Sequence, residues 1–254
     1  IAFLDSLEDA VSIYNLVSFF GIFALVLIAW AFSSNHRKFN WRCVAWGIGL
    51  QLLFALLVFT LPPVSKAFDV LSAGVVRMID ASRAGIDFCF GPLARSKEFI
   101  LAIQALPMIV FFASVMGILY YLGAMQRIIR LFSRLFTRLM NVSGAESLSV
   151  ASNVFVGIEA CATVRPYLDR MTRSELCTVL AAGFATIASS VLGMYVLMLR
   201  RSFPTIAAHL MSASVLAAPA AMVMSKLVLP ETETPETLGR VVDYGGERPA
   251  SLIE

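Results

Sequence analysis

Residues 153–167 read NVFVGIEACATVRPY, and no other stretch constrains the architecture of this chain more strongly. The stretch carries an amide, a glycine, a carboxylate, an arginine and a proline in a sequence that is otherwise largely apolar. On either side of VGIE stand two short pieces, SLSVASNVF and ACATV. A ten-residue helix is only about 15 Å long, half of the roughly 30 Å hydrocarbon core of a bilayer. Neither piece can therefore cross a membrane alone.

Charged residues flank this region on both sides, which indicates that both ends lie on the same side of a membrane. Glu146 precedes it, and Arg165, Asp169, Arg170 and Arg173 stand at its end and beyond. The sequence therefore predicts a re-entrant helical hairpin over 144–167 that enters from the cytoplasm and returns there, with Gly157 at or near its tip. Broken backbone at membrane depth is tolerated only where it is buried in protein or lines a wet cavity. Such a tip offers carbonyls from its first limb and N–H groups from its second, so it can hold a cation and a polar ligand together.

Composition places the whole chain in the membrane. Its 254 residues are 59% hydrophobic and 15% charged, with a mean hydropathy of +0.81, whereas a soluble domain carries about 25% charged residues. We therefore expect an all-α polytopic membrane protein. The net charge of +3 comes from basic clusters at helix ends, which indicates topology and not nucleic-acid binding. Two histidines and four scattered cysteines show neither metal-ligand spacing nor a disulfide framework.

About five segments have the length and apolar character of a transmembrane helix. They are 14–32, 43–61, 99–122, 176–199 and 203–229. The loop at 33–42, SSNHRKFNWR, is basic, whereas the first ten residues are acidic. The positive-inside rule then places this loop in the cytoplasm and the N-terminus outside.

Two further segments have the pattern of amphipathic helices. Segment 124–140 carries arginines at spacings of three and four, with apolar residues on its other side. This pattern predicts a helix in the cytoplasmic membrane interface. The arginines are Arg127, Arg130, Arg134 and Arg138, and the apolar residues are Ile128, Leu131, Leu135 and Leu139. Segment 64–97 is too charged to span and predicts one or two amphipathic helices beside the bilayer. The segment 230–254 is polar and rich in Pro and Gly, so we expect a solvent-exposed linker or tail with no domain after it.

The fourth predicted span contains a run of small and hydroxyl residues, GFATIASSVLG at 183–193. Small residues favour close helix packing, but a helix interruption that frees carbonyls beside the hairpin tip is about as well supported. A hard monovalent cation requires several oxygen ligands. Asn153 can supply a side-chain oxygen and Val156 a carbonyl one turn later, while Thr186 and Ile187 can supply a hydroxyl and a second carbonyl.

Several stretches together resemble the concentrative nucleoside transporter family. The run NVFVGIEACATVRPYLDRMTRSELCTVLAAGFATIASSVLGMYV, preceded by GAES, is similar to that family's hairpin and following helix. FNWRCVAWGIGLQLLFALLVF and LVLPETETPET are similar to its second helix and a characteristic loop. The resemblance implies nucleoside uptake driven by Na⁺, or by H⁺ in some members. It also implies a homotrimer and half of an inverted-repeat transporter fold, in a multi-pass protein of the inner membrane.

The resemblance also implies a domain division and site residues. Residues 1–123 would be scaffold-type helices with the insertion at 64–97, residues 124–229 part of a transport domain, and 230–254 the linker. The Na⁺ ligands would be Asn153, Val156, Thr186 and Ile187. The substrate-binding tip reads G-Q-T-E-A in the family, so Gly157, Ile158 and Glu159 would contact the nucleoside, with Glu159 matching the family's glutamate. Ile158 stands alone where the family has Gln-Thr, which removes an amide and a hydroxyl that would bind a nucleobase.

Three alternatives accompany this interpretation. Glu159 can serve substrate or cation coupling, or it can be a structural partner of Arg165 within the hairpin. The sequence ends before a second hairpin, so we expect an incomplete transporter, either a fragment or one completed by another polypeptide. A half-transporter or a regulatory or assembly subunit without transport activity of its own is therefore the second functional hypothesis. An enzyme is not expected, because the sequence shows no catalytic Ser/His pair or metal cluster.

Overall fold

The computed structural model describes residues 13–242 except 39, 61, 96–99 and 201. Within these residues every regular element is a helix, which confirms the all-α prediction. In chain order they are α2 (Ile13–Ala31), α3 (Trp41–Thr60), α4 (Pro62–Phe90), η1 (Gly91–Arg95), η2 (Leu101–Ala105), α5 (Leu106–Tyr121), α6 (Ala124–Phe136), η3 (Thr137–Asn141), α7 (Gly144–Val156), η4 (Gly157–Arg170), α8 (Arg173–Ala185), α9 (Ser189–Leu199) and α10 (Ile206–Val228). The elements η1 and η4 are 3₁₀ helices, and η2 and η3 are short π-helices.

Helices occupy the positions of all five predicted spans. Three helical stretches in the described chain are long and apolar enough to cross a membrane: Leu101–Tyr121, Arg173–Leu199 and Ile206–Val228. Val17–Ala31 and Trp41–Leu57 are shorter apolar helices. Large apolar side chains along α2 are exposed, among them Phe20 and Leu27. A helix that is apolar all round is typical of a membrane span.

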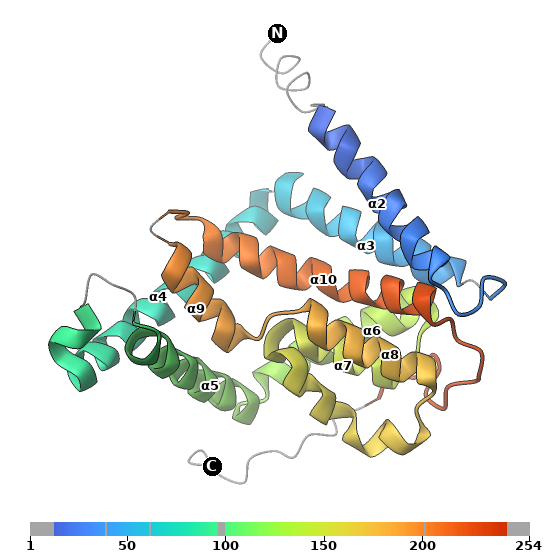
Figure 1. Cartoon of the computed structure of the whole chain (residues 1–254). Helices are drawn as coiled ribbons and strands as arrows, with labels where there is room; N and C mark the ends of the chain where they lie inside the picture. Colours follow the sequence, from blue (N-terminus) through green and yellow to red (C-terminus); the bar gives the residue numbers. More distant parts are fainter. Residues whose placement is uncertain (1–12, 39, 61, 96–99, 201, 243–254) are drawn as a thin grey trace.

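Two large hydrophobic cores hold the helices together, and α10 runs between α3 and α8 beside the first of them (Figure 1). That core joins α2, α3, α6, α7 and α10 around residues such as Met140, Leu148 and Met222. The second core joins α4, α5 and α9 around Ile79, Met108 and Val196. Because α2 and α3 share a core with α7 and α10, packing does not follow the division expected at residue 123. That division stays a prediction.

Helix α4 is one continuous 29-residue helix where the sequence predicted one or two over 64–97. Its charged residues exclude it from the apolar spans, and its buried residues Ile79 and Ile86 pack it into the second core. Asp80 forms an ion pair with Arg200 at the end of α9, with 2.7 Å between Oδ1 and Nη1. This contact fixes α4 beside the turn between α9 and α10.

Helix α6 is amphipathic as predicted over most of its length, but Ile128, Leu131 and Leu135, expected opposite the arginines, are exposed beside them. Each follows an arginine by one residue, which is only about 100° around the helix. Met125, Ile129 and Ser133 are buried against the first core, whereas the four predicted arginines are exposed. An exposed face that mixes arginine with leucine is typical of a helix at a membrane interface, and this location stays a prediction.

The predicted hairpin is present and has Gly157 at its tip. Helix α7 ends where Gly157 takes φ 78° and ψ −152°, and η4 then returns along α7. At the open end Ala145 packs with Val164 and Val179, so the two limbs meet again. The second limb extends to Arg170 as a 3₁₀ helix, three residues beyond the predicted boundary.

Residues 229–242, which we call the strap, tie the open end of the hairpin (Figure 1). Ser143 and Leu238 form an isolated antiparallel β-bridge, and the Gly144 N–H donates to the Thr237 carbonyl at 2.9 Å. Arg170, at the end of the other limb, pairs with Glu236 at 3.0 Å. The strap is polar and mostly exposed, as expected for a linker. It is nevertheless bound to both limbs.

Candidate functional site

The hairpin tip packs against an interruption between α8 and α9. Thr186 and Ala188 have extended backbone, with ψ values of 154° and 141°, so the chain leaves the helix for three residues. A Cβ placed on Gly157 would lie 2.8 Å from the Ala188 Cβ and 3.0 Å from its Cα. The extended backbone at Thr186 and Ala188 confirms the helix interruption, which was one of two possibilities left by the sequence. Small residues also permit close packing in the same region, since Gly193 lies against the Phe112 ring.

A side-chain hydrogen bond lies at the end of α8, where the interruption begins. The Thr186 hydroxyl donates to the Ala182 carbonyl at 2.9 Å, which is the side-chain bond by which Thr competes with the helical ladder. With Thr186, Ile187 and Ala188 outside both helices, backbone carbonyls near the end of α8 lose their regular i→i+4 partners. The interruption therefore leaves backbone carbonyls without helical partners next to the hairpin tip.

Asn153 joins the tip to α8. Its side chain is buried, and the amide orientation that satisfies both of its ends has the nitrogen donating to the Gly157 carbonyl and the oxygen accepting from the Gly183 N–H at 3.3 Å. Val156 is the last residue of α7, where the chain turns away at Gly157. The structure thus brings together the two segments that carry the predicted ligands, the last turn of α7 and the interruption at Thr186 and Ile187.

Helix dipoles give this meeting point a defined polarity. Helices α7 and α8 both end here, so their partially negative C-termini face it. Helices η4 and α9 both begin here, so their N–H groups face it as well. A helix C-terminus favours a cation and a helix N-terminus favours an anion or a polar acceptor. The arrangement can hold a cation beside a hydrogen-bonding ligand.

The predicted substrate residues are only partly described. Gly157 lies at the tip as expected, but the side chains of Ile158 and Glu159 fall outside the described residues. Arg165, the alternative partner of Glu159, is exposed. The substrate roles therefore stay predictions.

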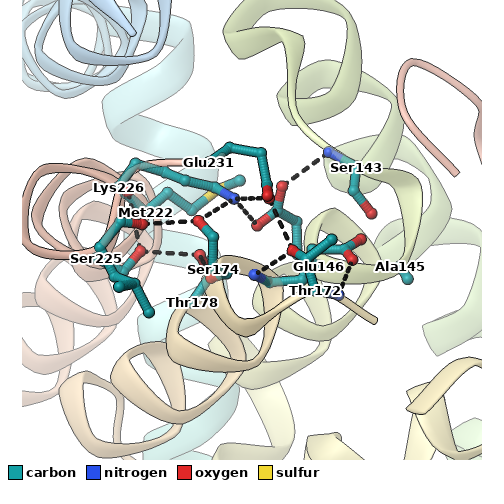
Figure 2. Close-up of polar contacts among 12 residues, drawn as sticks. Ser143, Ala145, Glu146, Thr172, Ser174, Thr178, Met222, Ser225, Lys226 and Glu231 are labelled. Atoms are coloured by element: carbon teal, nitrogen blue, oxygen red, sulfur yellow. Dashed lines mark hydrogen bonds and ion pairs between the residues drawn. The ribbon is translucent and has the colours of Figure 1, made fainter. Parts of the chain in front are cut away.

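Sequence reasoning missed a buried polar network at the opposite end of the hairpin (Figure 2). Lys226, in the last turn of α10, lies 2.8 Å from Glu146 Oε2, and these side chains are 4% and 1% exposed. Its Nζ also donates to Ser174 Oγ at 3.0 Å and lies 3.4 Å from Glu231 Oε2 in the strap. Burial raises the pKa of the Glu146 carboxyl, and the neighbouring ammonium opposes that rise. The available signal was a lysine within an otherwise apolar helix, which is rarely without a partner.

Two family profiles match most of the chain. One is described as "Na+ dependent nucleoside transporter N-terminus" and matches residues 20–93. The other is the gate profile described as "Nucleoside recognition", which matches residues 102–202. The junction between the profiles lies just before η2, and the second one covers the hairpin and the interruption.

Curated relatives and solved structures agree with these profiles. Solute carrier family 28 member 3 of Mus musculus is 43% identical over 223 residues, covering 87% of this chain and 31% of the relative. Sodium/nucleoside cotransporter 1 of Rattus norvegicus is 44% identical over 229 residues, covering 90% and 34%. The chain thus spans about a third of the length of these relatives. Among solved structures, the inward-facing, substrate-bound state of CNTnw gives a TM-score of 0.83 at 36% identity, covering 94% of this chain and 57% of that one.

An outward-facing state of CNTnw matches equally well, with a TM-score of 0.83. These matches are to multi-pass membrane transporters and not to enzymes. The residues that carried the resemblance, from Asn153 through the interruption at Thr186, lie within the matched gate region. This chain belongs to the concentrative nucleoside transporter family, of which it contains the N-terminal and gate regions.

Proposed function

We propose that this protein carries nucleosides into the cell across the inner membrane, coupled to Na⁺, with H⁺ as the alternative coupling ion. The observation that carries the proposal is the contact between the hairpin tip at Gly157 and the interruption at Ala188. It places a buried amide and a buried hydroxyl, from Asn153 and Thr186, beside the negative ends of two helices. The relatives named as sodium/nucleoside cotransporters support the same assignment.

The cation would be held by Asn153 Oδ1, Thr186 Oγ1 and the carbonyls of Val156 and Ile187. These are neutral oxygens, and hard cations prefer oxygen ligands. The Thr186 hydroxyl donates its hydrogen to the Ala182 carbonyl, which leaves the lone pairs of its oxygen available to a cation. The Asn153 amide would turn its oxygen toward the ion in place of its bond to Gly183. Bound there, the ion supplies positive charge that joins the tip to α8.

The nucleoside would bind at the start of η4, next to the ion. Gly157 allows close approach of a ligand to the backbone, and Glu159 would accept hydrogen bonds from ligand N–H or O–H groups. Ile158 provides an apolar contact where the family pattern has Gln-Thr, so recognition of the base would depend more on Glu159.

The proposed topology has five membrane-crossing helices, α6 in the cytoplasmic interface and the hairpin entering from the cytoplasm. Its support is that the basic loop contacts the same end of the fold as the hairpin base. The Ser34 N–H donates to the Val228 carbonyl at 2.9 Å, and Lys38 Nζ donates to Thr232 in the strap at 3.2 Å. Arg42 donates to the Arg138 carbonyl at 2.9 Å. Half of an inverted-repeat fold, assembled as a homotrimer, completes the proposal.

The test of function is uptake of labelled uridine and adenosine by proteoliposomes containing the full chain. We expect uptake that rises with an inward Na⁺ gradient and falls to background when choline replaces Na⁺. A proton gradient without Na⁺ tests the alternative coupling ion. Uptake that depends on neither gradient contradicts coupled transport.

The second candidate is a half-transporter that needs other segments to transport. This candidate is favoured by one observation: the chain spans only about a third of the length of its relatives. A chimera in which this chain replaces the matching 229-residue stretch of the rat cotransporter 1 separates the two. Uptake by the chimera but not by the chain alone supports the half-transporter. Absence of Na⁺-coupled uptake in both contradicts either form of the proposal.

Replacement of Thr186 tests the cation site. Thr186→Val keeps the shape and deletes the hydroxyl oxygen, so the Na⁺ concentration for half-maximal stabilisation should rise about tenfold, the loss of one hydrogen-bond-strength contact of about 1.4 kcal/mol. Thr186→Ser retains the oxygen and should change it much less. The measurement is thermal unfolding of the purified chain against Na⁺ concentration, with K⁺ as control. An unchanged Na⁺ dependence in Thr186→Val would place the ion elsewhere.

A further inference from the structure

Helices α7 and α8 are parallel and of equal length, and each begins at the Lys226 network and ends at the candidate cation site. Each has 13 residues. At their starts, Glu146 and Ser174 both contact the Lys226 ammonium. At their ends, the Asn153 amide lies against Gly183, and Gly157 lies against Ala188. The two helices therefore share a common start and a common end.

Lys226 distributes its contacts over three separate elements. Its Nζ reaches Glu146 in α7, Ser174 in α8 and Glu231 in the strap, at 2.8, 3.0 and 3.4 Å (Figure 2). An ammonium has three donors, and each is directed to a different part of the fold. The lysine thus ties the first turns of α7 and α8 directly to the last turn of α10.

The charges in this network suit the helix ends on which they lie. Glu146 is at the N3 position of α7, where its carboxylate accepts from the Ser143 N–H at 2.8 Å. Glu231 accepts from the hydroxyl of Thr172, the N-cap of α8, at 2.8 Å. A carboxylate is favourable at a helix N-terminus and a lysine at a C-terminus. One cation therefore joins a carboxylate in the first turn of α7 to a carboxylate bonded to the N-cap of α8, and it lies itself at the end of α10.

This arrangement fixes the axial register of α7 against α8. Asn153 lies seven residues beyond Glu146, which is two helical turns or about 10.5 Å along the same face. A helix transmits an axial shift along its length, and a slip of one residue is about 1.5 Å. Metal–oxygen distances tolerate only about 0.2 Å. The oxygens of Asn153 and Thr186 can meet one ion only while the register is held.

We propose that Lys226 is a positioning residue for the cation site, because it locks the register of the hairpin limb α7 to α8 through Glu146 and Ser174. The inference rests on the cation site proposed above. The lysine makes no contact with that site, and it acts by fixing where α7 and α8 begin.

The test compares Lys226→Met with two matched variants in the purified full chain. Lys226→Met deletes the ammonium, keeps the aliphatic stem, and should raise the Na⁺ concentration for half-maximal thermal stabilisation at least fivefold. It also leaves a buried Glu146 without its partner, so stability should fall. Thr178→Val removes the hydroxyl pair that Thr178 forms with Ser225 in the same network, at 3.0 Å, but no charge. It should leave the Na⁺ dependence near that of the wild type.

The double variant Lys226→Met with Glu146→Gln separates positioning from stability. It removes both buried charges, so the unfolding temperature should recover most of the loss, whereas the Na⁺ dependence should stay weakened because the tie is absent. Recovery of both together, or an unchanged Na⁺ dependence in Lys226→Met, overturns the inference. A wild-type chain that Na⁺ does not stabilise contradicts the proposed cation site instead. If Lys226→Met does not fold, Glu231→Gln is the substitute. It should raise the Na⁺ concentration for half-maximal thermal stabilisation by about twofold, and an unchanged Na⁺ concentration overturns the inference.

Discussion

Gly157→Ala is expected to lower the free energy of unfolding by about 2–6 kcal/mol and to abolish stabilisation by Na⁺. Two effects add at this position. The backbone angles of φ 78° and ψ −152° lie in a region that is essentially restricted to glycine, and a side chain there costs about 1–3 kcal/mol. The new methyl would also meet the Ala188 backbone nitrogen and Cα at 3.0 Å. Overpacking of this kind costs about 1–3 kcal/mol.

Gly239→Ala in the strap is the matched control. Gly239 also has a positive φ, 67°, but a Cβ there would meet nothing within 4 Å. The Gly239→Ala variant should therefore lose only the stability that its backbone angle costs, and Na⁺ should still stabilise it. Reversible unfolding in a denaturing detergent, followed with and without Na⁺, measures both quantities. Equal stability losses and an intact Na⁺ response in both variants would show that the hairpin tip does not pack closely against the interruption at Ala188.

Local sequence signals were sufficient for the hairpin and its tip. Two sub-spanning apolar pieces with charges at both ends leave few arrangements that satisfy the backbone in a membrane, and the structure has this hairpin. Gly157 was predicted at or near the tip because it stands between the two pieces, and the structure gives it the positive φ that glycine readily takes. The run of hydroxyl residues around Thr186 left two possibilities open, and the structure has the interruption, with extended backbone at Thr186 and Ala188.

The sequence did not reveal the Lys226 network, because its members are far apart in the chain. Glu146 and Lys226 are separated by 80 positions, and no helical spacing connects them. The strap has the composition of a linker, and its pairing with Ser143 depends on backbone hydrogen bonds that any residue can make. Long-range backbone pairing of this kind has no side-chain signature. The contacts of Arg42 could not be predicted for the same reason, because its side chain donates to backbone carbonyls in η3.

Glu159→Gln is expected to weaken nucleoside binding tenfold to a hundredfold. Glu159 follows Gly157 in the first turn of η4, where a helix N-terminus and the proposed cation would favour an ionised carboxylate. An ionised carboxylate only accepts hydrogen bonds, whereas glutamine presents one acceptor and one donor. A charge-assisted hydrogen bond contributes about 1.5–3 kcal/mol, which corresponds to the stated range. The measurement is equilibrium binding of labelled uridine or adenosine to the protein in Na⁺ buffer.

Arg165→Gln and the double variant distinguish substrate binding from a structural Glu159–Arg165 pair. Arg165 is exposed, and an exposed ion pair contributes only about 0–1 kcal/mol, so its removal should change stability little. If Glu159 serves the nucleoside, Arg165→Gln retains affinity and the stability effects of the two changes are additive. A structural pair has the opposite signature: strongly non-additive stability effects, with near-normal affinity in Glu159→Gln. Because the pair would have to act through an exposed arginine, we expect the loss to appear in affinity and not in stability, and that result would assign the carboxylate of Glu159 to ligand binding.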